Sequence, residues 1–338
     1  MGSLPSPPPV LSPSQVTSYL TYIGLPPSLH PSASPTLDLT YLTTLFTHQI
    51  TAIPYENLII HYSPSHTVSL DPQALFRKII NPPSTPRMGR GGYCMEVAIL
   101  FKHLLHALGF STAYTAGVRI RTRSRDGVPA GPYGGFVHLV ILITLPGDGA
   151  AGQRYVLDVG FGGDGPTRPM PLVEGMVHHN GVGTQEVRYA RGWLEGQTTF
   201  RSEGGGDRRL WIYEYRNGGG STGWNAFYAF DADFEFLEGD FGVMSYYTST
   251  AEASFQTRGV LVVRFLRGEG EDGGVKVAGK VMMVEGVVKR NLTGKTEVVK
   301  VCETEEERVE ALREWFGIVL TEEEVKSIKG RVSELKGV

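Results

Sequence analysis

Cysteine is nearly absent from this sequence. Its 338 residues include only two, Cys94 and Cys302, which lie far apart in the chain. A disulfide scaffold is therefore excluded, and free thiols in a reducing compartment are expected. Both thiols remain available for chemistry, so the function of the protein can depend on a cysteine.

The sequence also lacks a strong net charge and long apolar runs. Its 32 Lys and Arg residues stand against 35 Asp and Glu residues, which excludes a strongly basic protein that coats nucleic acid. No run approaches the ~18–20 apolar residues of a membrane span, and no basic segment followed by an apolar one opens the chain. We therefore expect a cytoplasmic protein with no membrane span and no nucleic-acid partner.

The first third of the chain has the periodicity of helices. Residues 1–36 hold nine of the 21 prolines and are expected to form an extended arm with a short helix around 14–23. Leucines and aromatic residues then recur at helical spacing over 37–60, and a second helical pattern covers about 71–80. From Val97 to Leu108 the apolar residues form one face of a helix that would begin at Cys94 and end before Gly109. The sequence thus predicts a helical N-terminal part with Cys94 at the start of a buried helix.

The period of the apolar residues changes to two after residue 112. Strands are predicted at 113–121, 136–145, 154–159, 209–215, 259–266 and 275–284. Two capping boxes, at Thr304 and Thr321, then mark the starts of C-terminal helices. The middle of the protein is therefore expected to be a β-sheet or barrel. Its glycine-rich loops lack the lysine and the spacing of nucleotide-binding motifs.

Cys94 is a candidate nucleophile because of its place at a helix N-terminus. The unsatisfied N–H groups there favour a thiolate over a thiol. The preceding Gly91 and Gly92 leave room for a substrate, and the N–H groups of their turn are candidates for stabilising an oxyanion. The alternative is a buried structural thiol, which is the more common role of a free cysteine.

A catalytic thiol needs an imidazole that takes and returns its proton, and a carboxylate that orients the imidazole. His138 and Asp158 each interrupt an otherwise apolar predicted strand, where an unpaired polar group would be costly. Two adjacent hairpin strands would place these side chains together. The residues therefore outline a Cys94–His138–Asp158 triad.

The other histidines do not suggest a metal site. His103 and His106 fall on the predicted helix opposite its apolar face and are expected in solvent. His178 and His179 are adjacent in a glycine-rich stretch, with no third ligand at the spacing that zinc requires. No metal ion is therefore expected.

Four separated segments resemble the arylamine N-acetyltransferase family. They are 90–96 (RGGYCME), 53–58 (IPYENL), the strand around His138 and 156–162 (VLDVGFG), in the order of the family. The resemblance implies an α+β fold with a cysteine-protease-like core. It further implies an N-terminal helical bundle (1–110) with the nucleophile, a central β-barrel (111–225) with His138 and Asp158, and a C-terminal α/β lid (226–338).

The resemblance also implies an activity. Cys94 would accept an acyl group from acyl-CoA and pass it to an aromatic amine or hydrazine in a ping-pong cycle, with His138 as base and acid and Asp158 as its orienting group. Acetyl-CoA is the first expectation for the donor and malonyl-CoA the alternative, each as a cosubstrate, with no bound cofactor. Detoxification of small aromatic amines is the role that such an enzyme would have.

Further contacts follow from the family pattern. Tyr55 and Phe136 would line the amine pocket, with plain core packing as the alternative. CoA would lie by a turn over 132–135 before the histidine strand, with Gly134, Gly135 and the adjacent Phe136 as contacts, and by Ser249 and Thr250. The resemblance also pairs Glu56 with Arg90 beside the cysteine loop. The alternating arginines would meet phosphate or face solvent: Arg119, Arg121, Arg123 and Arg125.

Two other functions stay open at this point. A thiol hydrolase or a transglutaminase-like protein would use the same three residue types. A noncatalytic ligand-binding protein on the same scaffold would need none of them to react.

Overall fold

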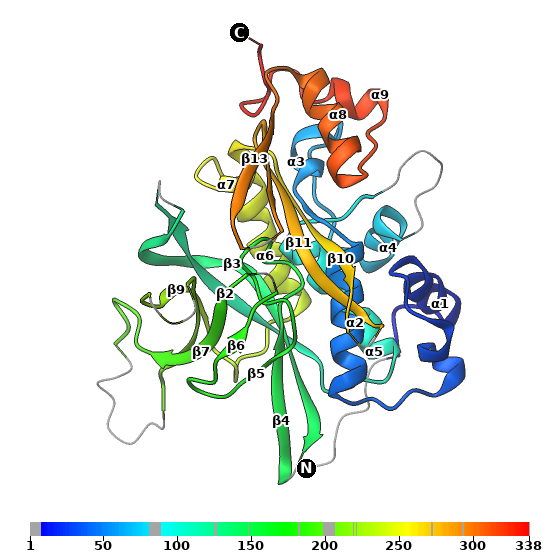
Figure 1. Ribbon diagram of the computed structural model, residues 1–338, viewed down its shortest axis with the longest axis vertical. Helices are drawn as coiled ribbons and strands as arrows, with labels where there is room; N and C mark the ends of the chain where they lie inside the picture. Colours follow the sequence, from blue (N-terminus) through cyan, green and yellow to red (C-terminus); the bar gives the residue numbers. More distant parts are fainter. Residues whose placement is uncertain are drawn as a thin grey trace.

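The computed structural model describes residues 8–80, 89–124, 127–147, 149–181, 183–198, 207–218, 220, 222–271, 273–292 and 294–337, with the backbone alone at 147 and 149–151. Within these ranges the chain forms a helical N-terminal part and two antiparallel sheets (Figure 1). Arg125 lies outside the described residues.

The N-terminal part is helical, as predicted. Its elements are α1 (Pro13–Tyr22), η1 (Pro27–Leu29), η2 (Pro31–Ala33), α2 (Leu39–Ala52), β1 (Tyr55–Glu56), α3 (Leu58–Tyr62), α4 (Pro72–Ile79) and α5 (Cys94–Ala107). The helical pattern over 37–60 divides into α2 and α3. Ile53, before Pro54, has extended backbone angles, because the residue preceding a proline is sterically excluded from the helical region.

The larger sheet has eight strands. They are β2 (Tyr114–Arg123), β3 (Pro129–Gly147), β4 (Gly149–Leu157), β5 (Met170–Pro171), β6 (His178–His179), β7 (Glu186–Gly192), β8 (Leu210–Arg216) and β9 (Asn225–Phe230). The order across the sheet is β5-β4-β3-β2-β9-β8-β7-β6. Figure 1 shows this sheet curled over its own inner face, which fits the expected central barrel as a half-barrel.

Two details of this sheet correct the sequence prediction. The expected turn over 132–135 is part of β3, because Tyr133 and Phe136 pair with Arg121 and Arg119 of β2 across register shifts. Strand β7 lies in a stretch for which no strand was predicted. Buried and part-exposed residues alternate along its first half, so a period of two was present there.

The smaller sheet joins the N-terminal helical part to the C-terminal part of the chain. Its order is β1-β10-β11-β12-β13, with β10 (Leu261–Glu269), β11 (Val275–Val284), β12 (Val287–Asn291) and β13 (Thr296–Val301). The helices of this part are α6 (Glu238–Thr250), α7 (Phe255–Arg258), α8 (Glu305–Phe316) and α9 (Glu322–Lys326). Thr304 and Thr321 cap α8 and α9 through their hydroxyls, which confirms both predicted starts.

Helix α5 lies at the centre of the main core. Its apolar side chains pack with those of α1, α2, α4 and α6, and with Leu139, Ile141 and Ile143 of β3. His103 of α5 is therefore buried rather than solvent-exposed, and burial lowers its pKa to about 4. The packing brings the N-terminus of α5 against β3, which carries His138, and against the segment after β4, which begins with Asp158.

Candidate active site

Cys94 is the first residue of α5. Its side chain is 4% exposed, and its Sγ donates to the Val137 carbonyl oxygen of β3 at 3.7 Å. The preceding residue, Tyr93, is held at both ends: its N–H donates to Glu96 Oε2 at 3.1 Å, and its hydroxyl lies 2.6 Å from Ser245 Oγ of α6. The thiol is thus fixed at the helix start and points to the histidine strand.

Glycine is required where the backbones around Cys94 meet. A Cβ at Gly91 would overlap the carbonyl oxygen of Pro54. A Cβ at Gly160, two residues after Asp158, would lie 2.7 Å from Cys94 Cα and 2.9 Å from its carbonyl oxygen. The absence of side chains at these two positions lets the segment after β4 press directly on the start of α5.

His138 and Asp158 form a buried pair. Nε2 of His138 lies 2.9 Å from Asp158 Oδ2, and the two side chains are 1% and 0% exposed. The other carboxylate oxygen of Asp158 accepts the N–H of Gly160 at 3.2 Å. The pairing of β3 with β4 brings them together, since Ile141, three residues after His138, stands opposite Leu157, which directly precedes Asp158.

The environment of His138 favours its charged form. Burial by itself lowers the pKa of this imidazole, but the charge and the hydrogen bond of Asp158 raise it, as do a hydrogen bond and the charge of Cys94. The balance raises the pKa of His138 to about 10. The structure therefore places the Cys94 thiol against β3 at Val137, next to His138, and Asp158 holds that imidazole and favours its charged form.

Aromatic rings surround this group of three side chains. The ring of Phe161 lies edge-on to His138 with centroids 5.2 Å apart, a contact that the sequence prediction missed although the motif after Asp158 contains this residue.

Tyr55 is buried, and its hydroxyl accepts a hydrogen bond from Gln256. Burial and the charge of Cys94 raise the pKa of Tyr55 well above its ordinary value. Phe136 is 36% exposed and packs on Phe236.

A buried cluster of charges lies behind the cysteine loop. Arg90 Nε lies 3.0 Å from Glu56 Oε1, and the fully buried Glu56 makes this a core pair rather than an ordinary surface pair. Lys78 lies 2.8 Å from Glu96 and 3.6 Å from Glu56. Arg90 and Lys78 overcome burial and lower the pKa of Glu56 to about 2. Glu324 completes the cluster at 2.8 Å from Arg90.

The glycine N–H groups before Cys94 are engaged in structure. The Gly91 N–H donates to Glu56 Oε1 at 3.3 Å, and the Gly92 N–H donates to the Pro54 carbonyl at 3.4 Å. These two groups, predicted as oxyanion donors, hold the loop in place instead. The first turn of α5 is therefore the better source of oxyanion donors.

The residues predicted to contact CoA lie on two elements. Gly134, Gly135 and Phe136 are exposed on β3, and a Cβ at Gly135 would meet no atom within 4 Å. Ser249 and Thr250 end α6, where their hydroxyls donate to carbonyl oxygens one turn earlier. The glycines therefore leave space for a ligand, whereas the two hydroxyls can only accept hydrogen bonds from one.

The alternating arginines of β2 do not simply face solvent. Arg119 lies over the Phe136 ring at 4.0 Å and donates to the Gly134 carbonyl at 3.0 Å. Arg121 donates to the Gly131 carbonyl at 2.7 Å, and Arg123 pairs with Asp164. Each guanidinium thus holds a neighbouring segment, and Arg119 does so beside the predicted CoA residues.

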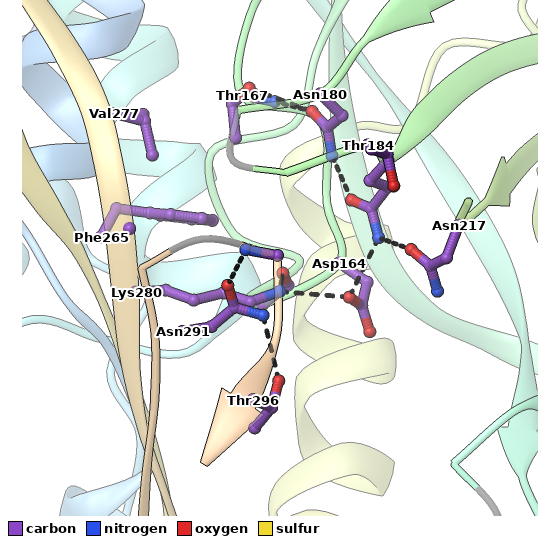
Figure 2. Close-up of a pocket in the computed structure, with 14 residues that line it drawn as sticks. Asp164, Thr167, Asn180, Thr184, Asn217, Phe265, Val277, Lys280, Asn291 and Thr296 are labelled. Atoms are coloured by element: carbon purple, nitrogen blue, oxygen red, sulfur yellow. Dashed lines mark hydrogen bonds and ion pairs between the residues drawn. The ribbon is translucent and has the colours of Figure 1, made fainter. Parts of the chain in front are cut away.

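A separate pocket of about 210 Å³ lies between loops of the larger sheet and strands β11 and β12 (Figure 2). Its polar side chains bind one another: Lys280 Nζ lies 3.2 Å from Asp164 Oδ1, and the Asn180 amide bonds both Thr167 and Gln185. Its volume is below the ~300 Å³ at which small-molecule sites begin. The pocket is therefore a polar seam between the sheets.

No three His, Cys, Asp or Glu side chains in the described ranges are placed to hold a metal ion. No helix within those ranges is both long and apolar enough to cross a bilayer.

Similarity to known proteins decides the family. A family model described as N-acetyltransferase matches residues 38–325. An N-malonyltransferase, FDB2, of Gibberella moniliformis is 34% identical over 284 residues, which are 82% of this chain and 76% of the relative. The chain belongs to the arylamine N-acetyltransferase family. Arylamine N-acetyltransferase 2 of Mus musculus is 36% identical over 148 residues, 44% of this chain and 43% of that protein.

The fold agrees with the family. The solved structure of Mycobacterium marinum arylamine N-acetyltransferase in complex with CoA superposes with a TM-score of 0.70 at 22% identity, over 95% of this chain and 99% of that one. At this identity the likeness shows the fold, and it confirms the predicted α+β architecture. The protein is an acyltransferase of the arylamine N-acetyltransferase family, for which acyl-CoA is the cosubstrate.

Proposed function

We propose that Cys94, His138 and Asp158 form the catalytic triad of an N-acyltransferase that acts on aromatic amines. The observation that carries this proposal is the buried His138–Asp158 pair, 2.9 Å apart, beside a cysteine at a helix N-terminus. A carboxylate in this place holds the imidazole and stabilises its charged form. A raised pKa of His138 supports an imidazolium that stabilises the reacting thiolate form of Cys94.

The first half of the cycle loads the cysteine. The Cys94 thiolate attacks the carbonyl carbon of acyl-CoA, and the N–H groups of the first turn of α5 receive the negative oxygen. The carbon–sulfur bond to CoA then breaks, and the CoA sulfur takes the proton of His138. This step leaves an acyl thioester on Cys94 and a neutral imidazole held by Asp158 through Nε2. Nδ1 is therefore the ring nitrogen that serves the reacting groups.

The second half transfers the acyl group. The nitrogen of an aromatic amine or hydrazine attacks the thioester, His138 takes the amine proton, and the carbon–sulfur bond to Cys94 breaks. Tyr55 and Phe136 are the proposed walls for the aromatic ring, since Tyr55 lies close enough to Cys94 to sense its charge and Phe136 is open to solvent. The cycle ends with the original thiolate and imidazolium.

We further propose malonyl-CoA as the preferred donor, ahead of the acetyl-CoA that the sequence placed first. The relative named N-malonyltransferase matches 82% of this chain, whereas the one named arylamine N-acetyltransferase 2 matches 44%. A malonyl group carries a free carboxylate, which needs a cation. Arg119 supports this donor: its guanidinium lies beside Gly134, Gly135 and Phe136, the proposed CoA contacts.

The test compares donors on the intact protein. Malonyl-CoA or acetyl-CoA is added with and without a simple aromatic amine, and free CoA is measured together with the mass of the Cys94 peptide. We expect an acyl adduct on Cys94, amine-dependent CoA release that is faster with malonyl-CoA, and no adduct in Cys94→Ala. Amine-independent CoA release would identify a thiol hydrolase instead. No adduct, with Cys94 alkylated by iodoacetamide no faster than an ordinary thiol, would identify a noncatalytic ligand-binding protein.

A further inference from the structure

Glu324 of helix α9 reaches the loop that carries Cys94 from the far end of the chain. Its Oε1 lies 2.8 Å from Arg90 Nη1, although the two residues are 234 positions apart in the sequence. The side chains of Arg90 and Glu324 are 6% and 5% exposed. A pair this deeply buried is costly to break, because removing one charge leaves the other without compensation.

Arg90 passes this contact on to the loop before Cys94. Its Nε binds Glu56 Oε1, and the same oxygen accepts the Gly91 N–H. The Glu56 N–H in turn donates to the Gly92 carbonyl at 3.0 Å. The guanidinium of Arg90 thus lies between two carboxylates. Glu56 also holds the next two residues, Gly91 through its carboxylate and Gly92 through its backbone N–H.

The backbones make a second contact at the same place. A Cβ at Gly89 would overlap the carbonyl oxygen of Gly317, the residue directly after α8. Both glycines have positive φ, 77° and 68°, which favours glycine at each position. Arg264 of β10 fixes the end of α8 by donating to the Phe316 carbonyl at 3.0 Å. Figure 1 shows α8 and α9, in orange and red, beside α3.

We propose that Glu324 is a positioning residue for acyl transfer: from α9 it holds Arg90, and through Arg90 and Glu56 it keeps residues 90–93 and the Cys94 thiol in their reactive arrangement. This inference rests on the proposed role of Cys94 as acyl carrier. With Glu324 neutralised, the carboxylate of Glu56 is the one ion-pair partner that Arg90 keeps among the described residues, and the guanidinium can turn toward it. A small displacement of the loop then moves the sulfur away from His138, and reaction rates are sensitive to such displacements.

Glu324→Gln is the decisive variant. Glu324 Oε2 accepts the Thr321 N–H at 2.9 Å, and the Thr321 hydroxyl accepts the Glu324 N–H at 3.2 Å. A glutamine keeps an oxygen for the Thr321 N–H, so the start of α9 is preserved. The negative charge that faces Arg90 is lost. Glu323→Gln, at an exposed neighbouring position, is the matched charge control. Thr321→Ala is the control for helix capping, because it leaves the Glu324 carboxylate in place.

The measurement is the single-turnover rate of Cys94 acylation by acyl-CoA, together with the KM for acyl-CoA. We expect Glu324→Gln to lower the rate about ten- to hundredfold with little change in KM, and both controls to react at the wild-type rate. Arg90→Lys keeps a charge but cannot span two carboxylates, so it is expected to lower the rate as well. A wild-type rate in Glu324→Gln or in Arg90→Lys, or an equal loss in Thr321→Ala, would overturn the proposal.

Alkylation of Cys94 by iodoacetamide separates this proposal from the proposed function. The reaction needs no acyl-CoA and reports how well His138 supports the thiolate. If the wild-type protein is never acylated, the proposed function fails, and the ratio of alkylation rates still tests Glu324. A ratio of one between wild type and a folded Glu324→Gln variant contradicts the positioning role.

Discussion

At the scale of single residues, Asp158 has two structural roles, one for each of its carboxylate oxygens. One carboxylate oxygen binds His138 Nε2 at 2.9 Å, and the other binds the N–H of Gly160, whose missing side chain lets the backbone approach Cys94. The residue that orients the imidazole therefore also holds the segment that lies against the nucleophile. The sequence predicted the first of these roles, because Asp158 interrupts an apolar strand, but it gave no sign of the second.

Asp158→Asn is expected to lower turnover about a thousandfold or more while the protein remains folded. Asp158 is the group that outweighs burial and raises the pKa of His138 to about 10, so the variant should carry a neutral imidazole at neutral pH. Alkylation of Cys94 measured from pH 5 to pH 10 checks this. The wild-type rate should already be high near pH 7, and the variant should require a higher pH. Identical profiles would remove Asp158 from the triad.

At the scale of elements, the loop before α5 is held by charges from four of them. Glu56 comes from β1, Lys78 from α4, Glu96 from α5 and Glu324 from α9, and Arg90 lies in the loop itself. The resemblance to the family predicted only the Arg90–Glu56 pair. Lys78 and Glu324 could not be predicted, because nothing in the local pattern of α4 or α9 distinguishes these two charges from solvent-exposed ones.

Glu56→Gln should change how the free energy of unfolding depends on pH. The pKa of Glu56 is lowered from 4.5 to about 2, so the group stabilises the folded protein above pH 4.5 and loses this contribution as the pH falls through 2. The shift corresponds to about 3 kcal/mol at neutral pH. Denaturant unfolding of wild type and variant between pH 7 and pH 2 measures it. The difference in free energy of unfolding should shrink toward low pH, and a constant difference would contradict the prediction.

At the scale of the whole molecule, the two ends of the chain share one sheet. β1 of the helical part pairs with β10. The fully buried Asn57, directly after β1, stabilises this junction between the two parts of the chain. Its side chain donates to the carbonyls of Gln256 and Gly259, at 3.1 and 2.9 Å, and accepts the Leu261 N–H at 2.8 Å. The N-terminal helices and the C-terminal sheet therefore depend on each other. The division of the chain at about 110 and 225 and the cytoplasmic location remain predictions.

Asn57→Ala is expected to lower the free energy of unfolding by about 3 kcal/mol, because three buried polar groups lose their partners. Asn217→Ala, at an exposed amide, is the matched control, and its effect should stay within about 0.5 kcal/mol. Chemical unfolding followed by fluorescence measures both. A loss in Asn57→Ala as small as that of the control would show that the junction does not depend on this side chain.

The sequence alone determined the local elements and the identity of the reacting groups. Apolar spacing marked α5 and β3, capping boxes marked α8 and α9, and the segments around Cys94, His138 and Asp158 pointed to the family. These signals are local, since helix and strand periods and caps depend on residues a few positions apart.

Only the tertiary structure decided which distant charges and backbones meet. The contact of Gly160 with Cys94, the engagement of the Gly91 and Gly92 N–H groups, and the approach of Glu324 to Arg90 each join segments far apart in the chain. A carboxylate on a short helix has the same sequence pattern whether it faces water or a buried guanidinium. Its partner is set by the packing of whole elements, which no local period encodes.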